Sequence, residues 1–227
     1  MSSQIPRIEM SVGNRSSGES PSASGHSSRL RRMRDFFVAC VIGVGLSPVF
    51  IVLTLMLARE GRPILFRQQR VGRNGKLFYV FKFRTMVPDA DELLRKILAG
   101  DEERSKEWAR DQKLKNDPRI TRTGRFLRKT SLDEIPQLLN VLKGEMSLVG
   151  PRPIVQDELS KYGRSARYYL SQNPGMTGLW QVSGRNDVSY KRRVAMDRLY
   201  AVRSSFVFDL AILIRTVVIV LRPRGAY

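Results

Sequence analysis

The segment TSLDEIPQLLNVLKGEMSLVGPRP, which runs from Thr130 to Pro153, contains a helical pattern that marks part of the core. Its apolar side chains recur at the spacing that places them on one helix face, namely Ile135, Leu138, Leu139 and Leu142. Asp133 and Glu134 stand just ahead of this series, and either Ser131 or Asp133 fits the N-cap position. We therefore predict a helix that carries two acids at its positively polarised end.

These neighbouring acids have a chemical interpretation and a structural one. The N–H groups at a helix start keep a carboxylate ionised and also suit a phosphate. An ionised Asp133 is a competent nucleophile toward phosphorus, and an adjacent Glu134 can hold a Mg²⁺ ion that neutralises phosphate oxygens. Both acids are therefore candidate catalytic residues and metal ligands, whereas ordinary capping of a helix explains the same pair without chemistry.

Basic residues gather around this segment. Pro151-Arg152-Pro153 predicts a stiff turn whose arginine can grip a phosphate or stack on a base. Upstream, short strands around the turn GRNGK, with alternation through Leu77 to Met86, predict a β-hairpin in which Lys82 and Arg84 share one face. A solvated strand face is the alternative explanation of that pair. The cations available for a diphosphate are Lys82, Arg84, Arg125, Arg128 and Lys129.

Composition limits the functions open to the chain. Its 227 residues suffice for one core with an appended element, and a formal net charge of +19 indicates an anionic partner such as nucleic acid, an acidic membrane or a phosphorylated substrate. Cys40 lies in an apolar run, and the sole histidine, His26, lies in a Ser/Gly-rich stretch. These counts exclude a disulfide framework, a zinc cluster and a Ser-His-Asp triad.

The N-terminal part divides into a polar tail and an apolar run. Residues 1–28 are rich in Ser and Gly, so we predict a disordered tail. The uncharged run from Phe36 to Ala58 is about 23 residues, or roughly 34 Å of helix, which is enough to cross a hydrocarbon core of about 30 Å. Because the run follows a long polar tail and lacks a cleavage site, it does not look like a secretory signal.

Two features favour a re-entrant hairpin over a straight membrane span in residues 29–60. Arginines flank the run on both sides, which puts both ends on the cytoplasmic face by the positive-inside rule. Proline at Ser47-Pro48 removes a backbone hydrogen bond in the middle, and the serine can supply a replacement. A straight span with a tolerated proline is the alternative. Residues 61–227 form the predicted cytoplasmic domain.

Further helices are predicted beyond the central segment. Ser189 to Arg203 reads as an amphipathic helix with Asp197 inside it. Residues 206–221 include Asp209 and Arg215 and are too short for a lipid span, so a core or interfacial helix fits better. We expect a mainly helical α+β fold with a re-entrant membrane hairpin, a compact cytoplasmic domain containing a small β-hairpin, and interfacial amphipathic helices.

Several motifs together resemble one family. KFRTM, SLDEIPQLLNVLKGEMSLVGPRP and NPGMTGLWQVSGRND, with the basic-flanked LSPVF ahead of them, are similar to the monotopic polyprenyl-phosphate phosphoglycosyltransferases, also called bacterial sugar transferases. The similarity covers roughly residues 30–227. The ending RGAY and the absence of a large N-terminal membrane domain look most like the short galactosyl- or glucosyl-phosphate transferases that initiate exopolysaccharide synthesis.

The resemblance implies a covalent two-step reaction. Asp133 would attack the sugar-linked phosphate of a UDP-sugar and release UMP, and undecaprenyl phosphate would then accept the phosphosugar. Glu134 would bind Mg²⁺, and the turn formed by Pro151, Arg152 and Pro153 would contact the nucleotide. Further candidate substrate-binding residues at matching motif positions are Lys82, Arg84, Arg128, Arg185 and Asp197.

The resemblance also implies a position at the membrane. Two alternative functions are considered after it. A hairpin broken at Ser47-Pro48 would hold the enzyme on the cytoplasmic face of the bacterial inner membrane, among anionic lipids. One rival is a basic, membrane-tethered binding protein, although no RNA platform or DNA-binding motif is recognisable, which counts against nucleic acid. The other rival is an inactive relative that scaffolds an assembly complex. The sequence identifies neither the sugar nor the polysaccharide, and it leaves a homo-oligomer open.

Overall fold

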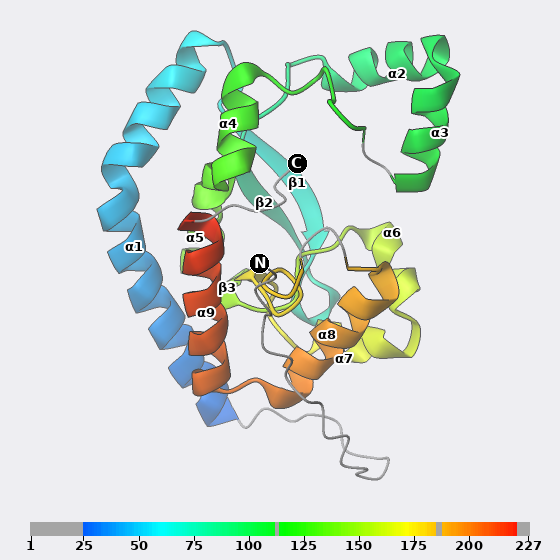
Figure 1. Cartoon of the computed structure of the whole chain (residues 1–227). Coiled ribbons are helices and arrows are strands. Elements are labelled where there is room, and N and C mark those ends of the chain that lie inside the picture. The colour runs from blue at the N-terminus through cyan, green and yellow to red at the C-terminus, as the bar shows by residue number, and fades with distance from the viewer. Residues whose placement is uncertain (1–24, 112–113, 185–187, 222–227) are drawn as a thin grey trace, which may run out of the picture.

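The computed structural model describes residues 25–111, 114–184 and 188–221 (Figure 1). Its longer helices are α1 (Gly25–Arg59), α2 (Ala90–Gly100), α3 (Glu102–Asp111), α4 (Arg122–Thr130), α5 (Leu138–Lys143), α8 (Tyr190–Arg203) and α9 (Phe206–Leu221). Short helical turns are α6 (Gln156–Leu159), α7 (Ala166–Leu170), η1 (Arg73–Gly75), η2 (Leu132–Gln137) and η3 (Ser160–Ser165). The strands are β1 (Leu65–Val71), β2 (Leu77–Phe83), β3 (Ser147–Val149) and β4 (Gly175–Thr177). The predicted mainly helical class is confirmed.

Strands β1 and β2 form the predicted antiparallel hairpin. Its turn contains Asn74 and Gly75 in the left-handed region, with φ of 58° and 78°, a conformation that these two residue types adopt at little cost. Asn140 of α5 occupies the other edge of β2, where its amide donates to the Tyr79 carbonyl at 2.7 Å and accepts from the Phe81 N–H at 3.1 Å. These bonds hold η2 and α5 against the hairpin.

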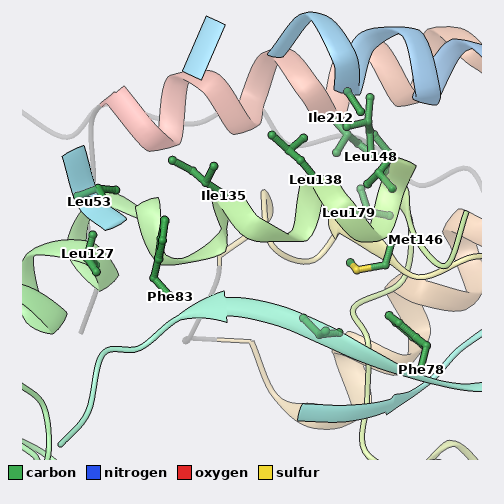
Figure 2. Packing of buried hydrophobic residues seen from close by; sticks show 14 of the residues in the cluster. Leu53, Phe78, Phe83, Leu127, Ile135, Leu138, Met146, Leu148, Leu179 and Ile212 are labelled. Atoms are coloured by element: carbon green, nitrogen blue, oxygen red, sulfur yellow. The ribbon is translucent and has the colours of Figure 1, made fainter. Parts of the chain in front are cut away.

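The main core has η2 and α5 as its middle layer, with the hairpin on one side and helices α1 and α9 on the other (Figure 2). Figure 2 shows Ile135 and Leu138 pointing from the middle layer toward the helices, while Phe78 lies on the hairpin side. All three are buried, and full burial of such a side chain stabilises the fold by roughly 1.5–3 kcal/mol. The acid-bearing turn η2 is thus anchored by the core.

Helix α1 is continuous and passes through Pro48. This proline leaves the Val44 carbonyl without its helical N–H partner, and the Ser47 hydroxyl donates to that carbonyl at 2.7 Å. The expected replacement hydrogen bond is confirmed, but the structure shows one helix rather than two helices separated at Ser47-Pro48. The helix also begins at Gly25, before the boundary predicted at residue 29, and the rest of the predicted tail lies outside the described residues.

Helix α1 lies along the side of the domain rather than pointing away from it (Figure 1). One stripe is buried against the body: Asp35, Ala39, Leu53 and Leu57. Other faces expose large apolar side chains, among them Phe37, Val44, Ile51 and Leu55. By length and composition α1 can cross a membrane. Helix α9, which runs beside it, adds exposed Phe206, Val207, Ile214 and Val217, so the two helices present an apolar surface typical of membrane association.

A polar network connects the N-terminal half of α1 to the rest of the protein. Asp209 of α9 accepts hydrogen bonds from Arg34 at 2.7 Å and from Arg31 at 3.2 Å. The Tyr200 hydroxyl of α8 lies 2.7 Å from Asp209 Oδ1 and 3.0 Å from the carbonyl oxygen of Val149 in β3. Since β3 leads directly into the Pro-Arg-Pro turn, this network joins the apolar helices to the candidate site.

Candidate active site

One face of the hairpin lines a small pocket. The strand register pairs Phe66 with Lys82 and Gln68 with Val80, and the alternation of side chains brings Arg70 to the same face. The pocket continues over η2, the turn after β3 and the segment that starts at β4. Its lining residues are Phe66, Gln68, Arg70, Val80, Lys82, Glu134, Gln137, Arg152, Pro153, Gly175, Met176 and Gln181. Tertiary packing therefore assembles the pocket from distant parts of the sequence.

The two acids lie in the 3₁₀ turn η2 and not at the N-cap of an α-helix. Ser131 has a left-handed φ of 58°, and its N–H returns to the Arg128 carbonyl at 3.3 Å, so this residue ends α4. Its side chain makes no capping hydrogen bond to η2. The prediction that Ser131 or Asp133 caps this helix is therefore wrong, because Ser131 ends α4 and Asp133 lies inside η2. The α-helix begins only at Leu138.

Lys82 joins the acid pair to the hairpin. Its Nζ lies 2.6 Å from Glu134 Oε1 and 3.9 Å from Asp133 Oδ2. The short contact is a charge-assisted hydrogen bond that fixes the Glu134 carboxylate, whereas Lys82 reaches Asp133 only through the longer contact. The lysine can therefore orient one acid and still attract a phosphate at the other.

Burial and charge act differently on the two acids. Burial raises the pKa of Asp133 to about 6, with Lys82 and Arg128 opposing the rise and Glu134 adding to it. Burial also disfavours the charged form of Glu134, but the Lys82 and Arg152 charges outweigh it and place its pKa below the ordinary value. Asp133 is thus ionised at neutral pH yet poorly solvated, which suits a nucleophile.

Arg128 is oriented toward this pair by a neighbouring hydroxyl. Its Nε donates to Thr85 Oγ1 at 2.9 Å, and its charge is close enough to lower the pKa of Asp133. Burial lowers the pKa of Arg128 itself, but a guanidinium stays protonated. Arg128 therefore contributes a fixed positive charge beside Asp133, although it does not line the pocket.

The Pro-Arg-Pro turn reaches the pocket through a tight backbone contact. Parallel pairing of β3 with β4 brings Gly150 against Gly175 so closely that a Cβ on Gly175 would lie 2.1 Å from the Gly150 nitrogen. The exposed Arg152 follows, with its guanidinium 5.7 Å from the ring centroid of the buried Trp180. Arg193 stacks on the same ring at 4.6 Å. Arg152 and Pro153 line the pocket, while Pro151 is buried behind them.

Besides Arg128 and Pro151, three of the sequence-predicted residues that the structure describes do not line the pocket, namely Arg84, Asp197 and Asp133, the last of which adjoins the lining residue Glu134. Arg84 lies beyond the end of β2, is buried, and donates to the Leu57 carbonyl of α1 at 3.4 Å, so the expected shared face with Lys82 is wrong. Because β2 ends at Phe83, the alternation of side chains no longer places Arg84 on the face that carries Lys82. Asp197 is buried in α8, where burial raises its pKa to about 7 against the opposing Tyr162 hydrogen bond and Arg152 charge. Arg185 lies outside the described residues.

Sequence reasoning missed Arg70 and Gln181. Arg70 lines the pocket, and burial together with the nearby charge of Arg152 lowers its pKa. Alternation along β1 opposite Lys82 was the available signal for Arg70, because it places the arginine on the same hairpin face as the lysine. Gln181 stands inside the motif NPGMTGLWQVSGRND, but its place in the pocket depends on how β4 packs beside β3, which the motif alone does not reveal.

The donor types at the acid pair are compatible with Mg²⁺. Among the described residues no group of three or more acidic, histidine or cysteine side chains gathers as a metal cage. Mg²⁺ is, however, commonly held by one or two carboxylates together with substrate phosphates and water. Asp133 and Glu134 supply that number of carboxylates beside a cationic pocket, so they fit a metal that arrives with a phosphorylated substrate.

Comparisons with known proteins place the chain in a family. The family described as "Bacterial sugar transferase" matches residues 26–223. The chain is 55% identical over 198 residues to the "Undecaprenyl-phosphate galactose phosphotransferase" of Salmonella typhimurium, covering 87% of this chain and 42% of that protein. It is 51% identical over 203 residues to the "UDP-galactose-lipid carrier transferase" of Erwinia amylovora, covering 89% and 43%.

A shorter relative matches along most of its length. The "Exopolysaccharide production protein ExoY" of Sinorhizobium fredii is 46% identical over 198 residues, which cover 87% of this chain and 88% of that protein. The chain thus spans about two fifths of the Salmonella and Erwinia relatives but nearly all of this one. Because the family match runs through the apolar helix, the acid pair and the Pro-Arg-Pro turn, the chain belongs to the bacterial sugar transferase family.

Proposed function

We propose that this chain transfers a sugar 1-phosphate from a UDP-hexose, such as UDP-galactose or UDP-glucose, to undecaprenyl phosphate. The observation that carries the proposal is a buried carboxylate, Asp133, beside the cations of a pocket in a family whose relatives have the matching names. The product would begin the synthesis of an exopolysaccharide or related glycoconjugate, in keeping with the name of the shorter relative.

In the first step, Asp133 attacks the phosphorus that bears the sugar. A bond forms between its carboxylate oxygen and phosphorus, the bond from that phosphorus to the bridging oxygen breaks, and UMP leaves with the electron pair. Lys82, Arg70 and Arg152 line the pocket and supply positive charge to the phosphate oxygens. The result is an aspartyl phosphosugar and free UMP.

In the second step, an oxygen of undecaprenyl phosphate attacks the same phosphorus. The bond to the Asp133 carboxylate breaks, which regenerates the enzyme and yields the undecaprenyl diphosphate sugar. The two substrates therefore react in turn, as in ping-pong kinetics. Asp133 and Glu134 are the side chains that would hold Mg²⁺, which neutralises phosphate charge when bound.

The packing of α1 supports a monotopic position at the cytoplasmic face of the inner membrane. Near one end, Arg32 donates to the Leu142 carbonyl at 2.6 Å, and near the other, Leu57 is buried in the core. A helix crossing the bilayer would have to carry this polar body into hydrocarbon, which is costly. We therefore place α1 and α9 in the cytoplasmic leaflet among anionic lipids, with the pocket at the interface. We also propose that α1 bends at Ser47-Pro48 in the membrane, so that it enters and leaves the bilayer on the same side.

Both ends of α1 are expected to be accessible from the cytoplasm. Single cysteines at the exposed positions Arg29 and Arg62, introduced into a Cys40→Ser background, should both react with an impermeant maleimide in inside-out membrane vesicles. Neither should react in right-side-out spheroplasts. Labelling of the two positions from opposite sides would instead establish a membrane span.

The proposed reaction is tested by UMP release. Purified full-length protein in detergent, supplied with Mg²⁺ and undecaprenyl phosphate, should release UMP with at least one of UDP-galactose, UDP-glucose and their N-acetyl forms. Each UMP should be matched by one phosphosugar in the lipid fraction. Folded protein that turns over none of these donors would contradict the proposal and favour an inactive scaffold.

A further inference from the structure

One residue of the pocket lining has a polar atom that its protein neighbours do not satisfy. Within the described residues, Gln181 Oε1 is buried and has no hydrogen-bond partner, and Gln181 is part of the pocket lining. Buried acceptors are nearly always paired, and an unpaired one costs free energy. An unpaired acceptor on a residue that lines a substrate pocket points to a donor that arrives with the ligand.

The orientation of this amide is fixed by its other end. Gln181 Nε2 donates to the Met176 carbonyl at 3.3 Å, and a carbonyl accepts only from the NH₂ side of the amide, which leaves the oxygen free. Gly178 provides room beside that oxygen, since a Cβ on this residue would lie only 3.1 Å from Oε1. The segment after β4 thus fixes the position of Gln181 Oε1 but provides no hydrogen-bond donor for it.

The other two glutamines of the pocket are already engaged. Gln68 Oε1 accepts from Arg70 Nη2 at 2.5 Å, and the Gln137 side chain hydrogen-bonds to Glu134. The cationic lining residues can only donate, and they suit phosphate oxygens. Gln181 differs from the cations because it offers a neutral acceptor, which a phosphate cannot use, and from the other two glutamines because its buried oxygen is unpaired.

We infer that Gln181 is a substrate-binding residue whose Oε1 accepts a hydrogen bond from the non-phosphate part of the nucleotide sugar. This inference rests on the proposed function. Two groups of a UDP-sugar have the required chemistry, namely the uracil N3–H and the hydroxyls of the two sugar rings. Either would pair the buried oxygen and orient the donor substrate while its phosphates contact Lys82, Arg70 and Arg152.

The test replaces the acceptor and leaves the rest of the pocket in place. Gln181→Met removes the amide at similar length, and we expect the KM for the UDP-sugar to rise about 5- to 10-fold, as for the loss of one hydrogen bond. The kcat and the KM for undecaprenyl phosphate should change less than about 2-fold. A residue with a merely structural role would alter all three. The matched control is Gln69→Met, since Gln69 is exposed on the opposite face of β1.

Substrate analogues identify the group of the nucleotide sugar that donates to Gln181. If the uracil N3–H is the donor, N3-methylation of the UDP-sugar should weaken its use by the wild-type protein, and Gln181→Met should weaken inhibition by UMP equally. If a sugar-ring hydroxyl is the donor, one deoxy derivative should lose affinity instead. An unchanged KM in Gln181→Met, or full binding of every analogue by the wild type, would overturn the inference.

Failure of the proposed function can be distinguished from failure of the inference about Gln181. If the wild type releases no UMP, the catalytic proposal fails, and calorimetric titration of UDP-galactose into wild type, Gln181→Met and Gln69→Met still measures the role of Gln181. Weaker binding in Gln181→Met alone would support the inference, and equal binding in all three, or none in any, would reject it.

Discussion

Replacing Asp133 with asparagine is expected to lower UMP release by at least about a thousandfold, because the substitution removes the oxygen nucleophile while nearly preserving its shape. The neighbouring acid Glu134 lines the pocket but is engaged by Lys82 at 2.6 Å, whereas Asp133 lies 3.9 Å from that lysine, so we assign the attack to Asp133. Wild-type protein incubated with UDP-sugar and Mg²⁺ but no lipid acceptor should gain one hexose phosphate by mass spectrometry. Asp133→Asn should gain none.

The control for this experiment is Asp91→Asn. Asp91 is an exposed acid in the first turn of α2, away from the pocket lining, so its replacement should leave both UMP release and adduct formation unchanged. Rapid UMP release by folded Asp133→Asn would contradict the covalent mechanism. Adduct formation at another residue would contradict the assignment of the nucleophile while leaving two-step transfer intact.

Replacing Asp209 with alanine is expected to cost about 3 kcal/mol of unfolding free energy, since it leaves Arg31 and Arg34 without their shared carboxylate. The estimate is at the lower end for a broken buried pair because the two arginines remain about a quarter exposed, at 24% and 22%. In detergent this should lower the thermal unfolding midpoint by roughly 6–12 °C. Differential scanning fluorimetry would measure it.

Arg215→Ala provides a control on the same helix. Arg215 is exposed, and we expect its replacement to change stability by no more than about 0.5 kcal/mol. A midpoint for Asp209→Ala that equals that of Arg215→Ala would show that the network between α1, α8, α9 and β3 is not needed for stability.

Local patterns were sufficient for several elements. The alternation around GRNGK specified the β1–β2 hairpin, and Ser189 marked the start of α8, where its hydroxyl accepts from the Arg192 N–H. The composition of residues 206–221 indicated a core or interfacial helix, and α9 occupies that span. Each of these features depends on residues within a few positions of one another, so their periodicity and turn chemistry are visible without a structure.

The candidate site was predictable in part. Neighbouring acids, a lysine in a strand and an arginine between prolines could be named from their residue types, and Lys82, Glu134 and Arg152 do line one pocket. The prediction for Arg84 was wrong because β2 ends at Phe83, before Arg84 is reached, and the Arg84 guanidinium donates to the Leu57 carbonyl of α1 instead. The residues next to Arg84 in the sequence do not reveal that the Leu57 carbonyl will be its partner.

The sequence by itself determined the periodic elements, the apolar helix and the presence of adjacent carboxylates, because those depend on neighbours along the chain. Only the tertiary structure decided that Ser131 ends α4, that α1 lies continuous along the domain, and that Arg70 and Gln181 share a pocket with Lys82. These outcomes depend on contacts between residues far apart in the chain. The free energy of such contacts comes from burial and hydrogen bonding across elements, which local propensity does not encode.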